Sequence, residues 1–231
     1  MRIVPAALSR LASRFLPQDC LVCGAQSGTA LLCEPCTASL PRLTQERCPV
    51  CALPTPLANV CGACLKTPPH FDATLALFTY AFPVDRLIQA LKYQAKLALA
   101  NYFGEALARE ALPTADLLIP LPLHPLRLRE RGFNQAVEIA RPLALPGRLQ
   151  LALDASERHL DTAPQASLAW NKRQRNVRGA FLCRVDLSRK HVIVIDDVMT
   201  SGATLDEFAR SLKSRGALRV TNLVVARTLP H

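Results

Sequence analysis

Four Cys-x-x-Cys pairs constrain the fold of this chain more than any other feature. Eight of the nine cysteines lie between residues 20 and 64, and nine residues separate the first pair from the second and the third from the fourth. A Cys-x-x-Cys turn presents two thiolates to one tetrahedral ion, and a second turn completes a site with no position open for water. The pattern therefore predicts two structural zinc sites with these ligands: Cys20, Cys23, Cys33, Cys36, Cys48, Cys51, Cys61 and Cys64.

The spacing leaves open how the ligands are shared between the two sites. A sequential arrangement takes the first four and the last four cysteines, a cross-braced one alternates the pairs, and the equal spacings favour the former. Disulfides would need an oxidising compartment, and residues 1–19 lack the apolar run and cleavage site of a signal peptide. Gly24 and Gly62 each follow a cysteine, and we expect both to let the backbone turn tightly beneath the metal.

The loops within the two ribbons, GAQSGTALL and ALPTPLANV, contain no Lys, Arg or aromatic residue. A ribbon that reads nucleic acid needs cations for the phosphates and rings for the bases. We therefore predict that the cysteine-rich module is a folding or docking element.

Length and charge set outer limits. The 231 residues accommodate a small module, placed at residues 1–68, and a larger domain at 69–231. The formal net charge of +10 attracts anionic partners, but it does not distinguish nucleic acid from a phosphorylated metabolite or an acidic membrane. No window approaches the ~18 apolar residues that cross a bilayer, so we predict a cytoplasmic protein without membrane insertion.

Residues 191–204, HVIVIDDVMTSGAT, carry the second strong pattern. The apolar run at 192–195 predicts a buried strand of a parallel sheet, which ends at two adjacent aspartates, Asp196 and Asp197. A hydroxyl-rich loop follows, and the apolar spacing after it predicts a helix over 203–215. The segment is thus expected to run strand, loop and helix N-terminus.

A loop in this position lies where parallel sheets bind ligands, beyond the carboxyl end of a strand. The helix N-terminus favours an anion, in practice phosphate. Thr200, Ser201 and Thr204 add hydroxyl donors, and Gly202 allows a close approach. Adjacent carboxylates repel each other, and two ribose hydroxyls or a hydrated Mg²⁺ would offset that repulsion. Phosphate beside a diol indicates a phosphorylated ribose.

The stretch IVIDDVMTSGAT resembles the motif of type I phosphoribosyltransferases that binds 5-phosphoribosyl-1-pyrophosphate (PRPP). With the cysteine-rich start, the ordered motifs CGACLKTPPHFD, ALKY, PLPLH, RLRERGFNQA, TAPQASL and RQRNVRGAF are similar to those of the ComF/GntX-like family, which is associated with competence and DNA uptake or use. Departures are small. Ser201 stands where threonine is commoner, and Leu126 and Trp170 stand where a basic or polar residue is often found.

The resemblance implies an α/β fold of the type I phosphoribosyltransferase kind, with a parallel sheet flanked by helices and a small N-terminal zinc-ribbon module. It implies that PRPP binds with Mg²⁺, that Asp196 and Asp197 hold the ribose hydroxyls, and that Arg175 closes over the pyrophosphate from a mobile flap at 154–178. The remaining PRPP ligands implied are Thr200, Ser201, Gly202, Ala203 and Thr204 around the 5-phosphate, and Arg129, Arg131 and Lys92 around the pyrophosphate.

Other patterns outline the rest of the domain. Strands are predicted at 71–80 and 116–121, one or two helices at 84–111, a proline-broken stretch at 120–132, and a helix at 134–145. Gly216 is predicted to close the last helix.

Three functions are compatible with these predictions. The first is an active phosphoribosyltransferase with an unidentified acceptor in nucleotide or nucleoside metabolism, linked to competence or DNA uptake. The second is a PRPP-binding accessory protein without turnover. The third is a protein that binds single-stranded DNA or the competence machinery, although the paired aspartates argue against DNA binding alone, because carboxylates repel phosphates.

Overall fold

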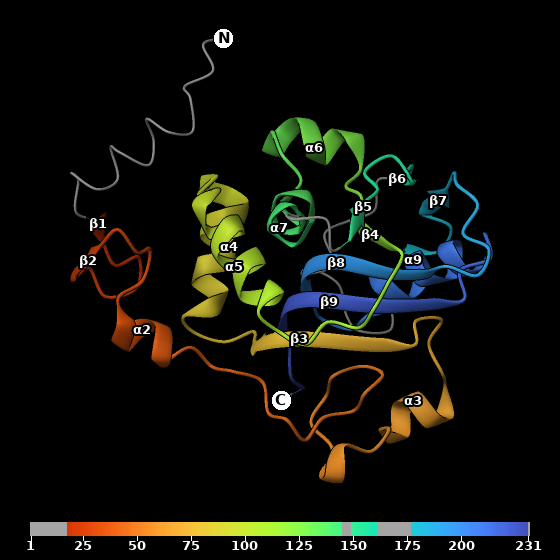
Figure 1. Cartoon of the computed structure of the whole chain (residues 1–231), viewed down its shortest axis with the longest axis horizontal. Coiled ribbons are helices and arrows are strands. Elements are labelled where there is room, and N and C mark those ends of the chain that lie inside the picture. Colours follow the sequence, from red (N-terminus) through yellow and green to blue (C-terminus); the bar gives the residue numbers. More distant parts are fainter. Residues whose placement is uncertain (1–17, 145–148, 161–176, 231) are drawn as a thin grey trace.

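A five-stranded sheet forms the centre of the computed structural model, which describes residues 18–144, 149–160 and 177–230 (Figure 1). Every neighbouring pair of strands is parallel. The predicted α/β fold with a parallel sheet is confirmed. In order across the sheet, the strands are β3 (Ala73–Thr79), β9 (Arg219–Arg227), β8 (His191–Met199), β4 (Leu117–Pro120) and β5 (Gln150–Leu151).

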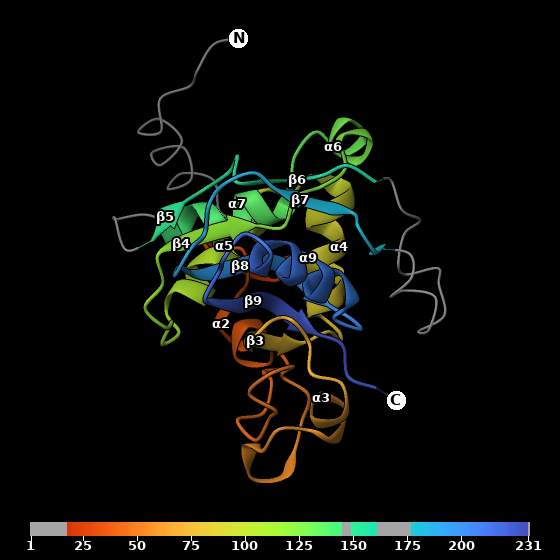
Figure 2. The same cartoon turned by 90° about the vertical axis from the view of Figure 1, so that its right-hand side faces the viewer.

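Helices cover both faces of this sheet. The chain passes from β3 to β4 through α4 (Val84–Gln94) and α5 (Ala98–Ala108), and from β4 to β5 through α7 (Gln135–Ala144). It returns in the opposite direction across the sheet from β8 to β9 through α9 (Ala203–Lys213). Because crossovers between parallel strands are right-handed, α5 and α7 lie on one face and α9 on the other (Figure 2).

Most predicted elements form, with shifted ends. The strands expected at 71–80 and 116–121 are confirmed as β3 and β4, and the stretch 84–111 forms two helices, separated where Ala95 takes a left-handed conformation (φ 51°). The last helix ends at Lys213 with Ser214 as its C-cap. Gly216 closes it as predicted: it has a φ of 91°, its N–H donates to the carbonyl of Lys213 at 3.0 Å, and the N–H of Ala217 donates to that of Leu212 at 3.3 Å.

The proline-rich stretch after β4 contains a helix, α6 (Pro125–Arg131). Pro125 occupies the first turn, where its missing N–H would have no intrahelical partner in any case. Gly132 ends the helix with a φ of 81°. Pro125 and Gly132 therefore delimit a short helix where the sequence suggested an interrupted backbone.

Helices α5 and α7 pack closely against each other at Gly104. A Cβ added there would lie 2.5 Å from the backbone oxygen of Ile139 and 2.8 Å from Cγ of Pro142. Helix propensity alone would make Gly104→Ala stabilising by about 1 kcal/mol. We expect it to destabilise the protein by about 1–3 kcal/mol instead, because the two helices must move apart. Urea denaturation measures the sign, and a stabilised variant would contradict the close approach.

The stretch predicted as a flap is described only at its ends. Near its start, β6 (Ser156–Arg158) pairs antiparallel with β7 (Phe181–Cys183), which lies just beyond its end. Residues 161–176, and with them Arg175, lie outside the described residues. The flap and the role of Arg175 therefore stay predictions.

The cysteine-rich module lies at two places beside the sheet (Figure 1). Its first half lies next to α4, and its second half lies along β3. Its elements are β1 (Gln18–Asp19), β2 (Gln26–Gly28), α2 (Glu34–Ala38), the 3-10 turn η1 (Pro56–Ala58) and α3 (Gly62–Lys66). Among the described helices, none has the length and apolar character needed to cross a membrane.

Candidate functional site

The sheet changes its winding direction between β4 and β8. The connection after β4 leads to one face of the sheet and the connection after β8 leads to the other. Such a switch point opens a crevice beyond the carboxyl ends of the two strands, and open α/β sheets bind ligands there. The segments that border it are α6 and the loop at 200–202.

Asp196 and Asp197 lie within β8, and not after its end as the sequence suggested. The reason is that β4 stops pairing with β8 at Ile195, whereas β9 continues to pair with it as far as Met199. The end of β8 therefore projects beyond β4 and carries both aspartates. Because successive side chains on a strand point to opposite faces, Asp196 borders the loop at 200–204 and Asp197 faces α4.

Asp197 forms an ion pair with Lys92, whose Nζ lies 2.6 Å from its Oδ2, and the Asp197 side chain is only 4% exposed. Burial acts to lower the pKa of Lys92, but the charges of Asp197 and Asp196 outweigh it and raise this pKa above its usual value. Burial, and then the charge of Asp197, raise the pKa of Asp196 well above its usual range. The site thus holds one paired carboxylate and one that binds a proton readily.

The loop after β8 turns through Gly202, which has a φ of 85° and serves as the N-cap of α9 without a side-chain cap. The hydroxyl of Ser201 accepts a hydrogen bond from the N–H of Ala203 at 3.3 Å. A cavity of about 30 Å³ lies inside this turn, room for two or three water molecules at about 10–15 Å³ each. Its lining residues are Asp196, Val198, Met199, Thr200, Gly202, Thr204 and Leu205.

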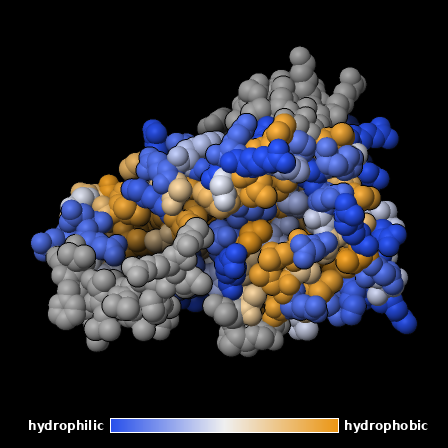
Figure 3. All heavy atoms as spheres, turned by 90° about the horizontal axis from the view of Figure 1, so that it is seen from above, coloured by the Kyte–Doolittle hydropathy of each residue, from blue (hydrophilic) through white to orange (hydrophobic). Residues whose placement is uncertain are grey.

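A larger cleft of about 540 Å³ opens between the end of α4 and α6. It brings together Lys92 and Arg131, two of the cations predicted to bind pyrophosphate, whereas Arg129 lies exposed on the same helix and does not line the cleft. Tyr93 lies under the guanidinium of Arg131 at 5.7 Å from ring centroid to Cζ. The side of the molecule that carries α6 exposes hydrophilic and hydrophobic side chains next to each other (Figure 3).

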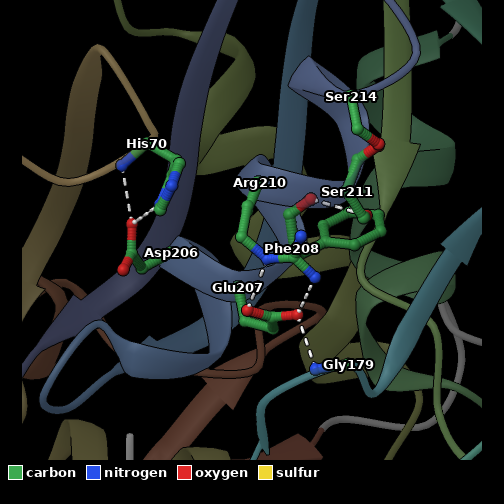
Figure 4. A network of polar contacts seen from close by, with 8 residues as sticks. All are labelled: His70, Gly179, Asp206, Glu207, Phe208, Arg210, Ser211 and Ser214. Atoms are coloured by element: carbon green, nitrogen blue, oxygen red, sulfur yellow. Dashed lines mark hydrogen bonds and ion pairs between the residues drawn. The ribbon is translucent and has the colours of Figure 1, made fainter.

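The outer face of α9 carries a second polar cluster (Figure 4). Asp206 accepts hydrogen bonds from the backbone N–H of His70 at 2.6 Å and contacts its Nδ1 at 3.0 Å. Glu207 accepts from the N–H of Gly179 at 2.7 Å and from Arg210 at 2.6 and 2.9 Å. These contacts fasten the chain before β3 and the chain before β7 to the helix that begins at the loop.

The eight cysteines form two clusters in the sequential arrangement, because the ligand atoms of the first four and of the last four each lie within 4.8 Å of one another. All nine cysteines are free thiols. Four thiolates at about 2.3 Å from a tetrahedral zinc lie about 3.8 Å apart, and the Cys23–Cys33 and Cys51–Cys61 sulfur distances are 3.7 and 3.6 Å. The donor sets therefore fit two structural zinc sites.

The two ribbons repeat the same backbone turns. In each ribbon, the carbonyl of the first cysteine accepts a hydrogen bond from the N–H four residues later. Gly24 donates to Cys20 in the first ribbon, and Ala52 donates to Cys48 in the second. Gly24 has a φ of 73° and Ala52 has a φ of 58°. The prediction for Gly24 is thus confirmed, whereas the one for Gly62 is wrong, because Gly62 begins α3 and the tight turn falls on Ala52.

Backbone groups prepare the leading thiols of both clusters for metal. Hydrogen bonds from the backbone, first that of Cys23, lower the pKa of Cys20 to about 6. Burial opposes the same shift at Cys48, but backbone hydrogen bonds from Cys51, Cys61 and Val50 still lower its pKa to about 7. Since zinc binds thiolates, these turns favour the ligand form of Cys20 and Cys48.

Arg227 was not among the residues predicted from the sequence. Its side chain is buried and donates hydrogen bonds to backbone carbonyls of the second ribbon and of the loop after β8. Every acceptor is a backbone oxygen, so no side-chain pattern could have identified these partners. The only available sign was a basic residue at the end of the apolar run LVVAR.

Two family models match the chain. A model of the double zinc ribbon domain matches residues 11–65, and a model of the phosphoribosyl transferase domain matches residues 129–229. The chain is 31% identical over 207 residues to the DNA utilization protein YhgH of Shigella flexneri, covering 86% of this chain and 91% of that protein.

More distant relatives cover most of the chain as well. Competence protein F of Haemophilus influenzae is 30% identical over 185 residues, which is 74% of this chain and 79% of that protein. Competence protein ComFC of Bacillus subtilis is 26% identical over 213 residues, with coverage of 85% and 84%. A solved purine phosphoribosyltransferase from Pyrococcus horikoshii aligns over 67% of this chain and 87% of its own, with 19% identity and a TM-score of 0.31.

Proposed function

Because the chain belongs to the ComF/GntX-like family, with a double zinc ribbon and a phosphoribosyl transferase domain, we propose that it binds PRPP and transfers its phosphoribosyl group to an acceptor. The observation that carries this proposal is the run of strand, paired aspartates, glycine turn and helix N-terminus at the switch point of the sheet. A phosphate at the turn and a ribose beside the aspartates fit that order of groups.

The ligand would lie across the end of β8. The loop at 200–204 would take the 5-phosphate, and Asp196 would accept the ribose hydroxyls. The cleft between α4 and α6 would take the pyrophosphate, with Arg131 as its main cation and Lys92 and Arg129 nearby. Arg175 would reach the same group from the flap.

Transfer from PRPP requires no covalent nucleophile. The bond from the anomeric carbon to pyrophosphate breaks through an oxocarbenium-like transition state, so catalysis rests on positioning and on charge. Mg²⁺, bound with PRPP, would neutralise the leaving pyrophosphate, and a carboxylate such as Asp196 is the kind of ligand it prefers. The chain's own contribution would be to bind the ribose and the pyrophosphate group of PRPP on the two sides of β8.

The biological setting follows from the relatives. They are named for DNA utilization and for competence, and we propose that this chain serves nucleotide or nucleoside metabolism linked to DNA uptake, with single-stranded DNA or competence proteins as further partners. We place it in the cytoplasm, because its free thiols suit a reducing compartment.

Titration of the protein with PRPP and Mg²⁺ tests this function. We expect saturable binding in the calorimeter, weakened about 10- to 100-fold by Ser201→Ala, which removes a hydroxyl donor to the phosphate. Ser214→Ala at the far end of α9, where the hydroxyl donates to the carbonyl of Ser211, is the matched control and should bind normally. A wild-type protein that binds no PRPP would refute the proposal.

Pyrophosphate release in the presence of nucleobases and amines then tests transfer. Production of pyrophosphate with one acceptor class would identify an enzyme. Binding without release for any acceptor would leave a PRPP-binding accessory protein, the second of the functions considered above.

A further inference from the structure

Arg227, the last residue of β9, is 2% exposed and has an unusual set of partners. Its Nε donates to the carbonyl of Cys51 at 2.9 Å. Its Nη1 donates to the carbonyls of Met199 and Thr228 at 2.9 Å each, and also to that of Thr200. One guanidinium therefore joins the second zinc ribbon to the start of the phosphate-binding loop.

The charge of this buried guanidinium has no carboxylate opposite it among the ion pairs of the described residues. A buried charge without compensation is strongly unfavourable. The second cluster lies beside it, because Nε of Arg227 donates to the carbonyl of Cys51, one of the four residues of that cluster. A zinc site of four thiolates carries net negative charge, so the loaded cluster would stabilise the guanidinium electrostatically.

The contacts on the other side set the direction of the loop amides. In a trans peptide the N–H points opposite to the C=O of the same unit. With the carbonyls of Met199 and Thr200 turned toward Arg227, the N–H groups of Thr200 and Ser201 point away from the ribbon. Arg227 thus helps to fix the orientation of the amides at the turn where an anion is expected, together with the N–H of Thr228, which also donates to the carbonyl of Met199 at 3.0 Å.

The first ribbon makes no comparable connection among the described residues. Its Leu21 and Val22 border a cavity of about 330 Å³ against α4 residues such as Leu87 and Ala90, away from the loop. Both ribbons contribute to the buried core, the first through Cys20 and the second through Cys48, but the hydrogen bonds of Arg227 join the second ribbon to the loop.

We propose that Arg227 is a positioning residue through which the second zinc ribbon holds the phosphate-binding loop in its anion-binding conformation. Metal in the second cluster is then required for binding at the loop, and metal in the first cluster is not. The identity of the anion, PRPP, rests on the proposed function.

Matched cysteine variants of the full chain test this coupling, because each ligand of one cluster has a counterpart in the other. Cys48→Ser and Cys20→Ser remove the leading ligand of the second and the first cluster, and zinc content measures the loss of metal in each. We expect Cys48→Ser to weaken PRPP binding at least about tenfold, and Cys20→Ser to leave it unchanged. Equal effects in the two variants would overturn the proposal.

Arg227→Lys keeps a cation but cannot reach all of these carbonyls, and it tests the coupling if Cys48→Ser does not fold. We expect a folded protein with wild-type zinc content and PRPP binding weakened about tenfold. Unchanged affinity would overturn the proposal.

A readout that does not depend on PRPP separates this proposal from the proposed function. The amide resonance of Gly202 in the nuclear magnetic resonance spectrum reports the loop directly. We expect it to shift or broaden in Cys48→Ser and in Arg227→Lys and to keep its position in Cys20→Ser. If the wild-type protein does not bind PRPP, the proposed function is refuted, but the expected shifts of the Gly202 resonance would still support the coupling. If the Gly202 resonance keeps its position in Arg227→Lys, the coupling alone is refuted.

Discussion

Near neutral pH, a Lys92→Met variant is expected to be about 3–5 kcal/mol less stable than the wild-type protein, the range for breaking one partner out of a buried ion pair. The substitution leaves Asp197, with its side chain 4% exposed, without its cation and beside a second buried carboxylate. Denaturant unfolding of both proteins measures the difference.

The loss should shrink as the pH is lowered. The pKa of Asp196 is already raised by burial and by Asp197, and the charge of Lys92 is what holds it down. Without Lys92 this pKa rises further, so the folded variant binds more protons than the unfolded chain and its stability falls as pH rises. Stability should fall over a pH range that begins near the ordinary pKa of an aspartate, about 4, and extends upward through the raised pKa of Asp196.

Two further variants separate this explanation from lost packing. Lys96→Met removes an exposed lysine just after the same helix and should change stability little. In Lys92→Met combined with Asp197→Asn, no unpaired charge is left at this pair, so much of the stability should return. A double variant no more stable than Lys92→Met alone would contradict the ion-pair account.

Removal of zinc by a chelator is expected to unfold the N-terminal region, the largest structural effect among these predictions. Structural zinc sites in small domains contribute about 10–16 kcal/mol of binding free energy. The amides of the first ribbon should lose all their protection from hydrogen exchange. The second should lose it together with its attachments to the sheet, where Leu43 donates to the carbonyl of Leu77 at 2.9 Å and Thr74 donates to that of Pro49 at 3.1 Å.

Hydrogen exchange with mass spectrometry measures this directly. We expect deuterium uptake to rise across residues 18–66 and in β3, while β8 and β4, in the middle of the sheet, stay protected. Unfolding confined to the ribbons, with β3 fully protected, would show that the sheet does not depend on them. Restored protection after zinc is added back would exclude damage by the chelator.

Much of the fold was predictable because its signals are local. The apolar run of β8, the loop and the apolar face of α9 follow one another in sequence, and so do the paired cysteines of each ribbon. Equal spacings also favoured the sequential pairing of the ligands, which the clusters confirm.

What could not be predicted depends on contacts between distant segments. The length of β8 is set by its neighbour β9, so the sequence placed the strand end before Asp196 rather than after Met199. The pairing of Lys92 with Asp197 joins a helix to a strand about a hundred positions further on. The carbonyl partners of Arg227 leave no trace in side-chain patterns.

The segment before and inside the second ribbon also covers one border of the sheet. Its backbone forms hydrogen bonds with β3 at Leu77, Thr79 and Thr74, and β3 pairs with β9 along its other border. A strand border with free N–H and C=O groups is a template for joining another chain. Cells short of zinc would therefore be expected to accumulate this protein as self-associated aggregates, so metal supply would govern its solubility as well as its ligand binding.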